Sequence, residues 1–190
     1  MVEEEKSKKE KKGFREEIEI PRGIDVKADN GTVTVKGPKG ENKKEMLNKR
    51  VDIKVEGNKI IVSSKKSAKR EKMIMKSFKA HINNLLKGVV EPYSYTLKIC
   101  SGHFPMTVSV NKNQLIVKNL LGEKIPRVLD LKEGVTVKVE GENIIVESTD
   151  KEKAGQCAAS IEQLTRRTGY DTRVFQDGCW ITIKDKKEIK

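Results

Sequence analysis

The chain has 190 residues, of which 35% are hydrophobic, so modest hydrophobic cores and two small domains are expected rather than one large domain. Lys and Arg number 40 against 28 Asp and Glu, and the formal net charge of +12 favours a polyanionic partner, nucleic acid first, because phosphate contacts release condensed counterions. No stretch approaches the roughly 20 apolar residues of a membrane-spanning helix, so a membrane protein is not expected.

The N-terminal residues 1–17 carry charges of both signs and few apolar side chains, so they are expected to form a mobile charged tail. A solubilising extension is favoured over a specific RNA contact. The segment lacks the apolar core of a secretory signal and is too acidic for an organellar transit peptide. A cytoplasmic protein is therefore expected.

A strand pattern comes after the tail. Apolar residues alternate over residues 18–35 around an Asn30-Gly31 turn, which predicts a hairpin. The Lys-Gly-Pro-Lys-Gly sequence of residues 36–40 is expected to end the strand, because Pro cannot donate to a strand ladder. A second hairpin is expected from residues 51–55 and 60–62.

After Ser64 the spacing of apolar residues changes from every second residue to nearly every fourth, which predicts a helix. Lys87-Gly88 is expected to end it. The residues on its apolar face are Ile74, Phe78, Ile82 and Leu85.

The same order of elements then returns, after a strand expected at residues 93–99. Residues 106–118 match residues 24–36 at an offset of 82. Residues 135–146 match residues 51–62 at an offset of 84 and are identical to them at most positions. An internal duplication is therefore predicted.

The second copy also ends in a predicted helix. Thr149 and Glu152 have the spacing of a capping box at its start. The apolar positions that recur at helical spacing are Ala154, Cys157, Ala158, Ile161 and Leu164.

The predicted fold class is α+β, with two tandem copies of an antiparallel sheet that is covered on one face by a helix. The expected organisation is the tail at residues 1–17, a first repeat at residues 18–90, and a second repeat at residues 91–190. Only the second repeat continues into an extension that is rich in Arg, Gly and aromatic residues.

This C-terminal extension, residues 166–181, combines groups that suit RNA. Arg side chains grip phosphate bidentately, and Gly lets the chain approach a sugar-phosphate backbone. A terminal hairpin of residues 173–175 with residues 180–183, around an Asp177-Gly178 turn, is an alternative interpretation. The two are compatible, with the hairpin as scaffold and the preceding loop as contact.

Two further basic segments lie beside predicted strands. Residues 63–90 hold eight Lys or Arg against one Glu, and residues 36–50 hold six against two Asp or Glu. Contact with a nucleic-acid backbone explains this bias. For the helix, an ordinary solvated face is an equally supported alternative.

Candidate catalytic motifs have simpler structural explanations. Residues 36–40 lack the Gly-Lys-Ser/Thr ending and the subsequent helix of a nucleotide-binding loop. Cys100, Ser101 and His103 are close in sequence, but catalytic groups usually meet from separate loops, so a structural bend is favoured. His81 lies among apolar helix residues, where packing is favoured over a ligand or base. An enzyme is not expected, and no small-molecule substrate or cofactor is implied.

The cysteines are odd in number and widely spaced, with no CxxC pair and no His at ligand spacing. Reduced structural thiols are therefore expected rather than a redox or metal site. They are Cys100, Cys157 and Cys179.

Six short motifs, in order along the duplicated body, carry a resemblance to a known family. They are Pro21-Arg22-Gly23-Ile24, residues 35–40 (Val-Lys-Gly-Pro-Lys-Gly), His103-Phe104-Pro105, residues 119–124 (Asn-Leu-Leu-Gly-Glu-Lys), residues 155–161 (Gly-Gln-Cys-Ala-Ala-Ser-Ile) and residues 173–178 (Arg-Val-Phe-Gln-Asp-Gly). The chain resembles the large-subunit ribosomal protein L-six family, in its archaeal and eukaryotic branch. The resemblance spans about residues 18–183 and leaves out the tail.

The resemblance implies two similar α+β domains, no enzymatic activity, and binding of large-subunit rRNA near the sarcin–ricin loop and the base of the factor-recruiting stalk. The other partners it implies are neighbouring ribosomal proteins, with translational GTPases nearby. Its main rRNA contacts are expected from the second domain. Carried over by position, the expected RNA-binding residues are Asn119, Gly122, Lys124 and Arg127 of one loop, and Arg166, Arg167, Thr168 and Arg173 after the last helix.

A free-standing RNA- or DNA-binding chaperone or regulator is the alternative function. It has the same need for basic surface but no need to remain attached to a ribosomal subunit.

Overall fold

The computed structural model describes residues 13–29, 31–64 and 68–189. The chain divides into two compact units, one ending at Val89 and the other beginning at Val90. Most of the predicted tail (residues 1–12) and Asn30 of the predicted turn lie outside the described residues. Within the described ranges, neither helix is long and apolar enough to cross a membrane.

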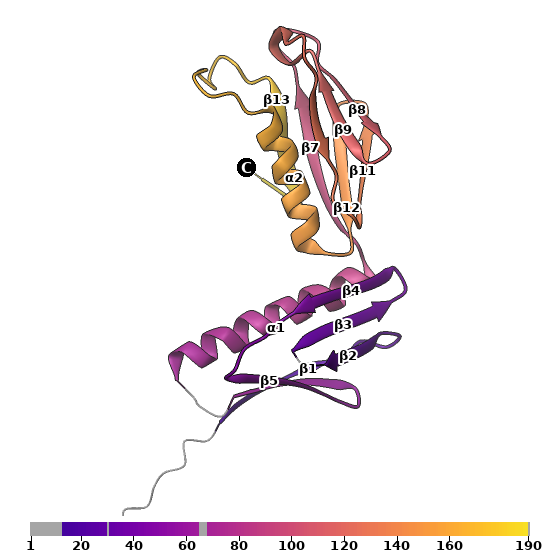
Figure 1. Cartoon of the computed structure of the whole chain (residues 1–190), viewed down its shortest axis with the longest axis vertical. Coiled ribbons are helices and arrows are strands. Elements are labelled where there is room, and N and C mark those ends of the chain that lie inside the picture. The colour runs from indigo at the N-terminus through magenta and orange to yellow at the C-terminus, as the bar shows by residue number, and fades with distance from the viewer. Residues whose placement is uncertain (1–12, 30, 65–67, 190) are drawn as a thin grey trace, which may run out of the picture. The chain divides into compact units, whose positions relative to one another are not determined.

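Unit 1 consists of two antiparallel three-stranded sheets and one helix (Figure 1). One sheet has the strand order β1-β6-β5 and the other has the order β2-β3-β4. Their inward apolar side chains form one core with the buried face of the helix. The elements are β1 (Phe14–Glu19), β2 (Asp25–Asp29), β3 (Thr32–Gly37), β4 (Gly40–Glu45), β5 (Val51–Glu56), β6 (Lys59–Ser64) and α1 (Lys69–Val90).

The first strand begins earlier than its apolar pattern predicts. β1 starts at Phe14, so residues 14–17 belong to a sheet rather than to the predicted tail. They pair with β6, where Phe14 lies opposite Ser64. Glu16 fits this half-buried setting because its carboxylate pairs with the Lys79 ammonium at 2.9 Å.

The first helix runs past its predicted end. Gly88 is buried within α1, which continues to Val90. The helix stops before Glu91-Pro92, since a residue that precedes proline is disfavoured in the α conformation. The buried face includes Met75, Ile82, Leu85, Leu86 and Val89.

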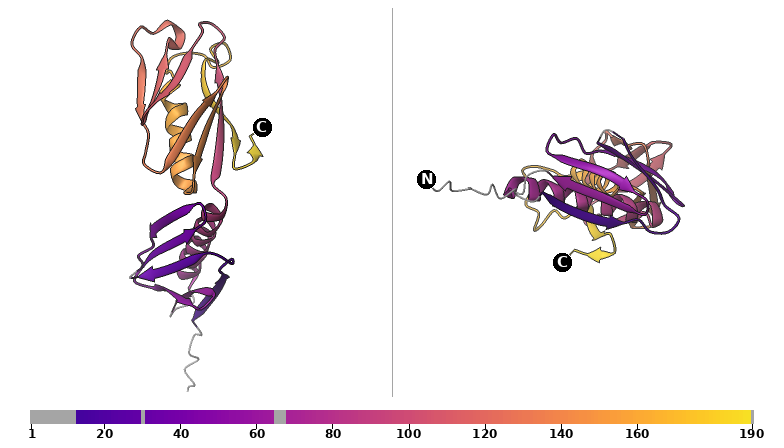
Figure 2. Two further views of the ribbon diagram at one scale, coloured as in Figure 1. Left: turned by 90° about the vertical axis from the view of Figure 1, so that its right-hand side faces the viewer. Right: turned by 90° about the horizontal axis from the view of Figure 1, so that it is seen from below.

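Unit 2 repeats this plan with a larger sheet. Its two antiparallel sheets have the strand orders β11-β12-β7-β13-β14 and β10-β9-β8. The helix α2 packs against both of them, as Figure 2 also shows. The elements are β7 (Tyr93–Cys100), β8 (Thr107–Asn111), β9 (Gln114–Lys118), a 3-10 turn (Leu120–Gly122), β10 (Arg127–Asp130), β11 (Val135–Glu140), β12 (Asn143–Ser148), α2 (Lys151–Thr165), β13 (Gly178–Lys184) and β14 (Lys187–Glu188).

The α+β class and the two sheet-plus-helix copies are confirmed, and the copies correspond strand by strand. β1-β6-β5 matches β7-β12-β11, and β2-β3-β4 matches β8-β9-β10. Equivalent loop hydrogen bonds also recur, with Met46 N donating to Gly31 O at 2.7 Å and Leu131 N donating to Asn113 O at 2.8 Å. The sequence pattern predicts one sheet in each copy, whereas the strands of each copy divide between two sheets.

Two predictions about unit 2 are wrong. The residue that caps α2 is Asp150, one position after Thr149, and its carboxylate accepts a hydrogen bond from Glu152 N at 2.9 Å. The C-terminal hairpin does not form, because β13 pairs with β7 and β14 instead of with residues 173–175. Those residues form part of a loop.

Candidate nucleic-acid interface

Three loops of unit 2 meet beside the C-terminal end of α2. They are residues 101–106 between β7 and β8, residues 119–126 between β9 and β10, and residues 166–177 between α2 and β13 (Figure 1). Hydrogen bonds and ring contacts join all three. The eight residues predicted to bind RNA lie in or directly beside the second and third loops.

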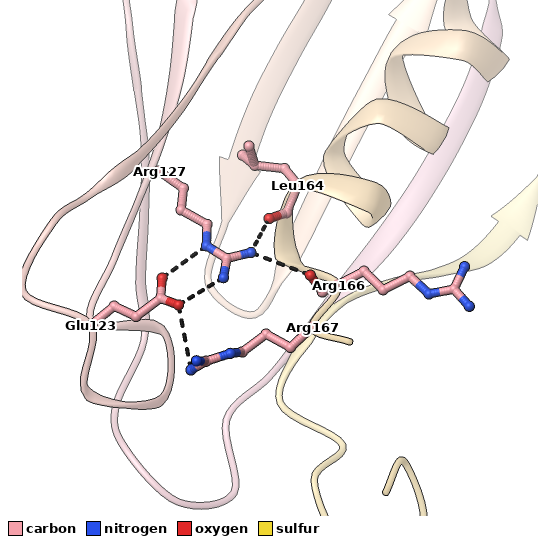
Figure 3. A network of polar contacts seen from close by, with 5 residues as sticks. All are labelled: Glu123, Arg127, Leu164, Arg166 and Arg167. Atoms are coloured by element: carbon pink, nitrogen blue, oxygen red, sulfur yellow. Dashed lines mark hydrogen bonds and ion pairs between the residues drawn. The ribbon is translucent and has the colours of Figure 1, made fainter. Parts of the chain in front are cut away.

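Arg127 and Glu123 form the centre of a polar network between the second loop and the third (Figure 3). Arg127 Nε and Nη2 donate to the two oxygens of Glu123 at 2.8 and 2.7 Å. Arg127 Nη1 also donates to the backbone oxygens of Leu164 and Arg166, the latter at 3.4 Å. Arg167 Nη1 lies 3.4 Å from a Glu123 oxygen. The guanidinium of Arg127 is therefore occupied mainly by protein partners.

This network fixes the end of α2. The last carbonyls of a helix have no partner inside the helix, and Arg127 supplies donors to Leu164 and to Arg166 just after it. The hydrogen bonds from Arg127 and the nearby positive charges lower the pKa of the Glu123 carboxyl, against the opposing effect of partial burial. The carboxylate that holds the two loops together is thus stabilised in its charged form.

The arginines after α2 have different surroundings. Arg166 is exposed, and its side chain points away from the network in Figure 3. Arg167 is half-buried and its guanidinium carbon lies 4.6 Å from the centroid of the Tyr170 ring. Thr168 and Arg173 are exposed. The third loop therefore presents at least Arg166 and Arg173 to solvent.

The second loop is shaped by left-handed backbone. Asn119 has a φ of 59° and Gly122 a φ of 79°, a conformation that Gly and Asn tolerate best. The Asn119 amide donates to Pro105 O at 2.9 Å, which joins this loop to the first. Lys124 and its neighbour Ile125 are exposed at the tip. Asn119 therefore stabilises the conformation of the loop. The exposed ammonium of Lys124 is available to bind an anion.

Asp177 connects the first loop to the third. Its carboxylate accepts hydrogen bonds from Gly102 N at 2.7 Å and His103 N at 3.1 Å, and its other oxygen lies 2.6 Å from His103 Nδ1. Burial opposes ionisation of this carboxyl, but the contacts with His103 and Gly102 outweigh it and hold the pKa below its ordinary value. The His103 ring stacks on Phe175 at 4.8 Å, which completes the junction.

The stability of unit 2 is therefore expected to depend on the ionisation of Asp177. Because its folded-state pKa is lowered, its contribution is present above the ordinary value of 3.8 and is lost as pH falls through the lowered value. Asp177→Asn removes this dependence. Urea unfolding at a series of acidic pH values, followed by the fluorescence of Trp180, is expected to show a shallower loss of unfolding free energy in the variant. Parallel curves for the two proteins would contradict this assignment.

Sequence reasoning missed Glu123, Asp177 and Tyr170 as members of the site. Glu123 stands four residues before Arg127, a spacing that could have indicated an ion pair, but it lies in a loop where spacing alone does not fix geometry. The partners of Asp177 are more than 70 residues away, so no local pattern signals them. The aromatic residues of this extension are visible in the sequence, but the sequence alone does not indicate a role for Tyr170.

The described parts of the basic segments of unit 1 lie at the end of β3, on β4, in the loop before β5, at the end of β6 and on α1, and residues 65–67 are outside the described residues. Their exposed cations include Lys69, Arg70 and Lys76 on α1, whose one acidic residue, Glu71, is buried and pairs with Arg50 at 3.0 Å. His81 Nδ1 lies 3.1 Å from the Lys44 ammonium nitrogen. Across both units, the described residues include no cluster of three or more His, Cys, Asp or Glu that could hold a metal ion.

The chain is similar to known proteins over nearly its whole length. Residues 20–91 and 104–178 match the family model described as ribosomal protein L6. The "Large ribosomal subunit protein uL6" of Methanococcus vannielii is 44% identical over 176 residues, which cover 93% of this chain and 97% of the relative. The protein of the same description from Methanobrevibacter smithii is 40% identical over 172 residues, or 90% of this chain and 97% of the relative.

Proposed function

The chain belongs to the ribosomal protein L6 family, and from this premise we propose that it is a structural constituent of the large ribosomal subunit that binds rRNA through the loops of unit 2. It would contact rRNA near the sarcin–ricin loop and the base of the factor-recruiting stalk. This location is supported by the family resemblance. Neighbouring ribosomal proteins would be its other direct partners, and translational GTPases would act nearby in the cytoplasm.

The observation that carries the RNA contact is the exposure of cationic groups on loops with fixed conformations. Arg166 and Arg173 project from the third loop and Lys124 from the second. The Arg127–Glu123 pair joins these loops. Cations held in place in this way lose less side-chain and loop entropy on binding than cations of a mobile tail.

The eight predicted residues would divide into two roles. Arg166, Arg167, Thr168, Arg173 and Lys124 would contact rRNA, with phosphate contacts dominating the affinity. The other three, Asn119, Gly122 and Arg127, would shape and join the loops. The resemblance alone does not separate these roles, whereas the hydrogen bonds of Asn119 and Arg127 do support the division.

Sedimentation through a salt wash tests this function. A structural constituent is expected to remain with purified large subunits at moderate salt, because many phosphate and shape contacts act together. A free-standing RNA or DNA binder would be stripped from the subunits under the same wash. Loss of the chain from the large-subunit fraction would therefore favour the alternative function and contradict the proposal.

A further inference from the structure

A hollow of about 710 Å³ opens in unit 2 beside the loops described above. It lies between the last turns of α2, the neighbouring ends of β7 and β13, and the third loop. Small-molecule sites typically enclose about 300–1,000 Å³, so the hollow has room for one nucleotide. Its aromatic lining residues are Tyr170, Phe175 and Trp180.

The aromatic walls are held in place by contacts within the protein. The Tyr170 ring meets Phe175 edge to face at 5.0 Å, and Phe175 stacks on His103 at 4.8 Å. The Arg167 guanidinium lies over the Tyr170 ring at 4.6 Å. Trp180 Nε1 donates to the Gln176 backbone oxygen at 2.9 Å. Fixed aromatic and guanidinium planes are the surfaces on which unpaired RNA bases stack.

The polar lining residues of the hollow suit both parts of a nucleotide, with hydrogen-bonding groups for a base and a guanidinium for its phosphate. The lining includes charges of both signs, from Glu162 and Asp177 and from Arg166 and Arg167. The carboxylate of Glu162, together with the Gln163 amide, can bond the amino and ring nitrogen groups of a base edge. Arg166, which is exposed and lines the hollow, offers a guanidinium fork to the attached phosphate.

We propose that this hollow binds a single unpaired nucleotide of the RNA partner, with its base against Tyr170 and Trp180 and its phosphate on Arg166. The inference rests on the proposed function and deepens it. RNA recognition by unit 2 would then consist of two parts: exposed cations that bind any backbone, and one site that requires a base outside a helical stack.

The test uses the whole chain and two RNA stems that differ only in one bulged nucleotide. Trp180 is the single tryptophan of the sequence, so its fluorescence reports on the hollow directly. The bulged stem is expected to quench Trp180 and to bind about ten-fold tighter than the fully paired stem, since stacking of one base on an aromatic side chain has an effect of this order. Equal affinities together with unchanged fluorescence would overturn the proposal.

Two variants separate the hollow from the surrounding surface. Tyr170→Leu is expected to abolish the preference for the bulged stem while leaving salt-dependent binding of the paired stem. Phe104→Leu is the matched control, because Phe104 is an exposed aromatic residue near the same loops that does not line the hollow. If Phe104→Leu removed the preference as completely as Tyr170→Leu, the hollow would not be the site. The comparison of the two stems uses the unaltered chain, so it tests the proposal even if a variant fails to fold.

Further measurements show whether the hollow prefers RNA to a free nucleotide, and whether a negative result concerns the hollow alone or RNA binding by unit 2 as a whole. A free mononucleotide, AMP, is expected to quench Trp180 only at far higher concentration than the bulged stem, and equal potency would overturn the assignment to RNA. Binding of both stems without discrimination would overturn the hollow alone. Failure to bind either stem would instead count against RNA binding by the unit 2 loops.

Discussion

Replacement of Arg127 by alanine is expected to lower the free energy of unfolding of unit 2 by about 1.5 to 3 kcal/mol, the range for hydrogen bonds that involve a charged group. The change would remove the donors of Leu164 O and Arg166 O at the end of α2. It would also leave the carboxylate of Glu123, whose side chain is 25% exposed, without its bidentate partner. Urea unfolding followed by Trp180 fluorescence measures the effect.

Two variants control this prediction. Arg127→Lys keeps the charge but not the planar fork, so it is expected to recover less than half of the lost stability. Arg173→Ala removes an exposed arginine of the same unit and is expected to change stability by less than about 0.5 kcal/mol. If Arg127→Ala unfolded at the same urea concentration as the unaltered chain, the network would not hold the loops together.

Joint replacement of Arg166, Arg167 and Arg173 by glutamine is expected to weaken RNA binding on the order of 100-fold at 0.1 M salt. Each lost phosphate contact lowers the slope of log affinity against log salt by roughly 0.7 to 0.9, so the triple variant should lose about two units of slope. The ion pair of Arg167 with Glu123 is partly exposed and does not preclude a phosphate contact, since such pairs contribute little. Filter binding over a salt series measures both quantities.

The matched control changes the same amount of charge in unit 1. Lys69, Arg70 and Lys76 are exposed on α1, and their joint replacement by glutamine is expected to leave most of the salt slope intact. An equal loss of slope in the two triple variants would mean that net charge, rather than the loops of unit 2, determines binding. An unchanged slope after the unit 2 replacement would remove the third loop from the interface.

The duplicated strands and both helices could be predicted because their apolar side chains recur at the spacing of a strand or of a helix with one buried face. β4 could not, because its residues, Gly-Glu-Asn-Lys-Lys-Glu, include no apolar side chain and its place in the sheet depends on backbone pairing with β3. The C-terminal hairpin was mispredicted for a related reason. β13 pairs with β7, about 80 residues earlier, and no local turn signal reveals such a partner.

The site shows the same limit. A cationic C-terminal extension is visible in composition, but the division of labour among its arginines is not. Arg127 and Arg166 look alike in sequence, yet one is bound to Glu123 and the end of α2 while the other is exposed. The difference depends on which loops meet after folding, and the contacts between Asp177 and His103 span 74 residues.

The first repeat and the second therefore share an architecture but differ in the segment after the helix, which in unit 2 carries the exposed arginines. Protein–RNA crosslinking within purified large subunits tests most directly whether this segment lies on rRNA. We expect crosslinked peptides mainly from residues 119–127 and 166–177 of unit 2, attached to large-subunit rRNA. Crosslinks confined to unit 1, or none to rRNA from either loop, would contradict an interface in unit 2.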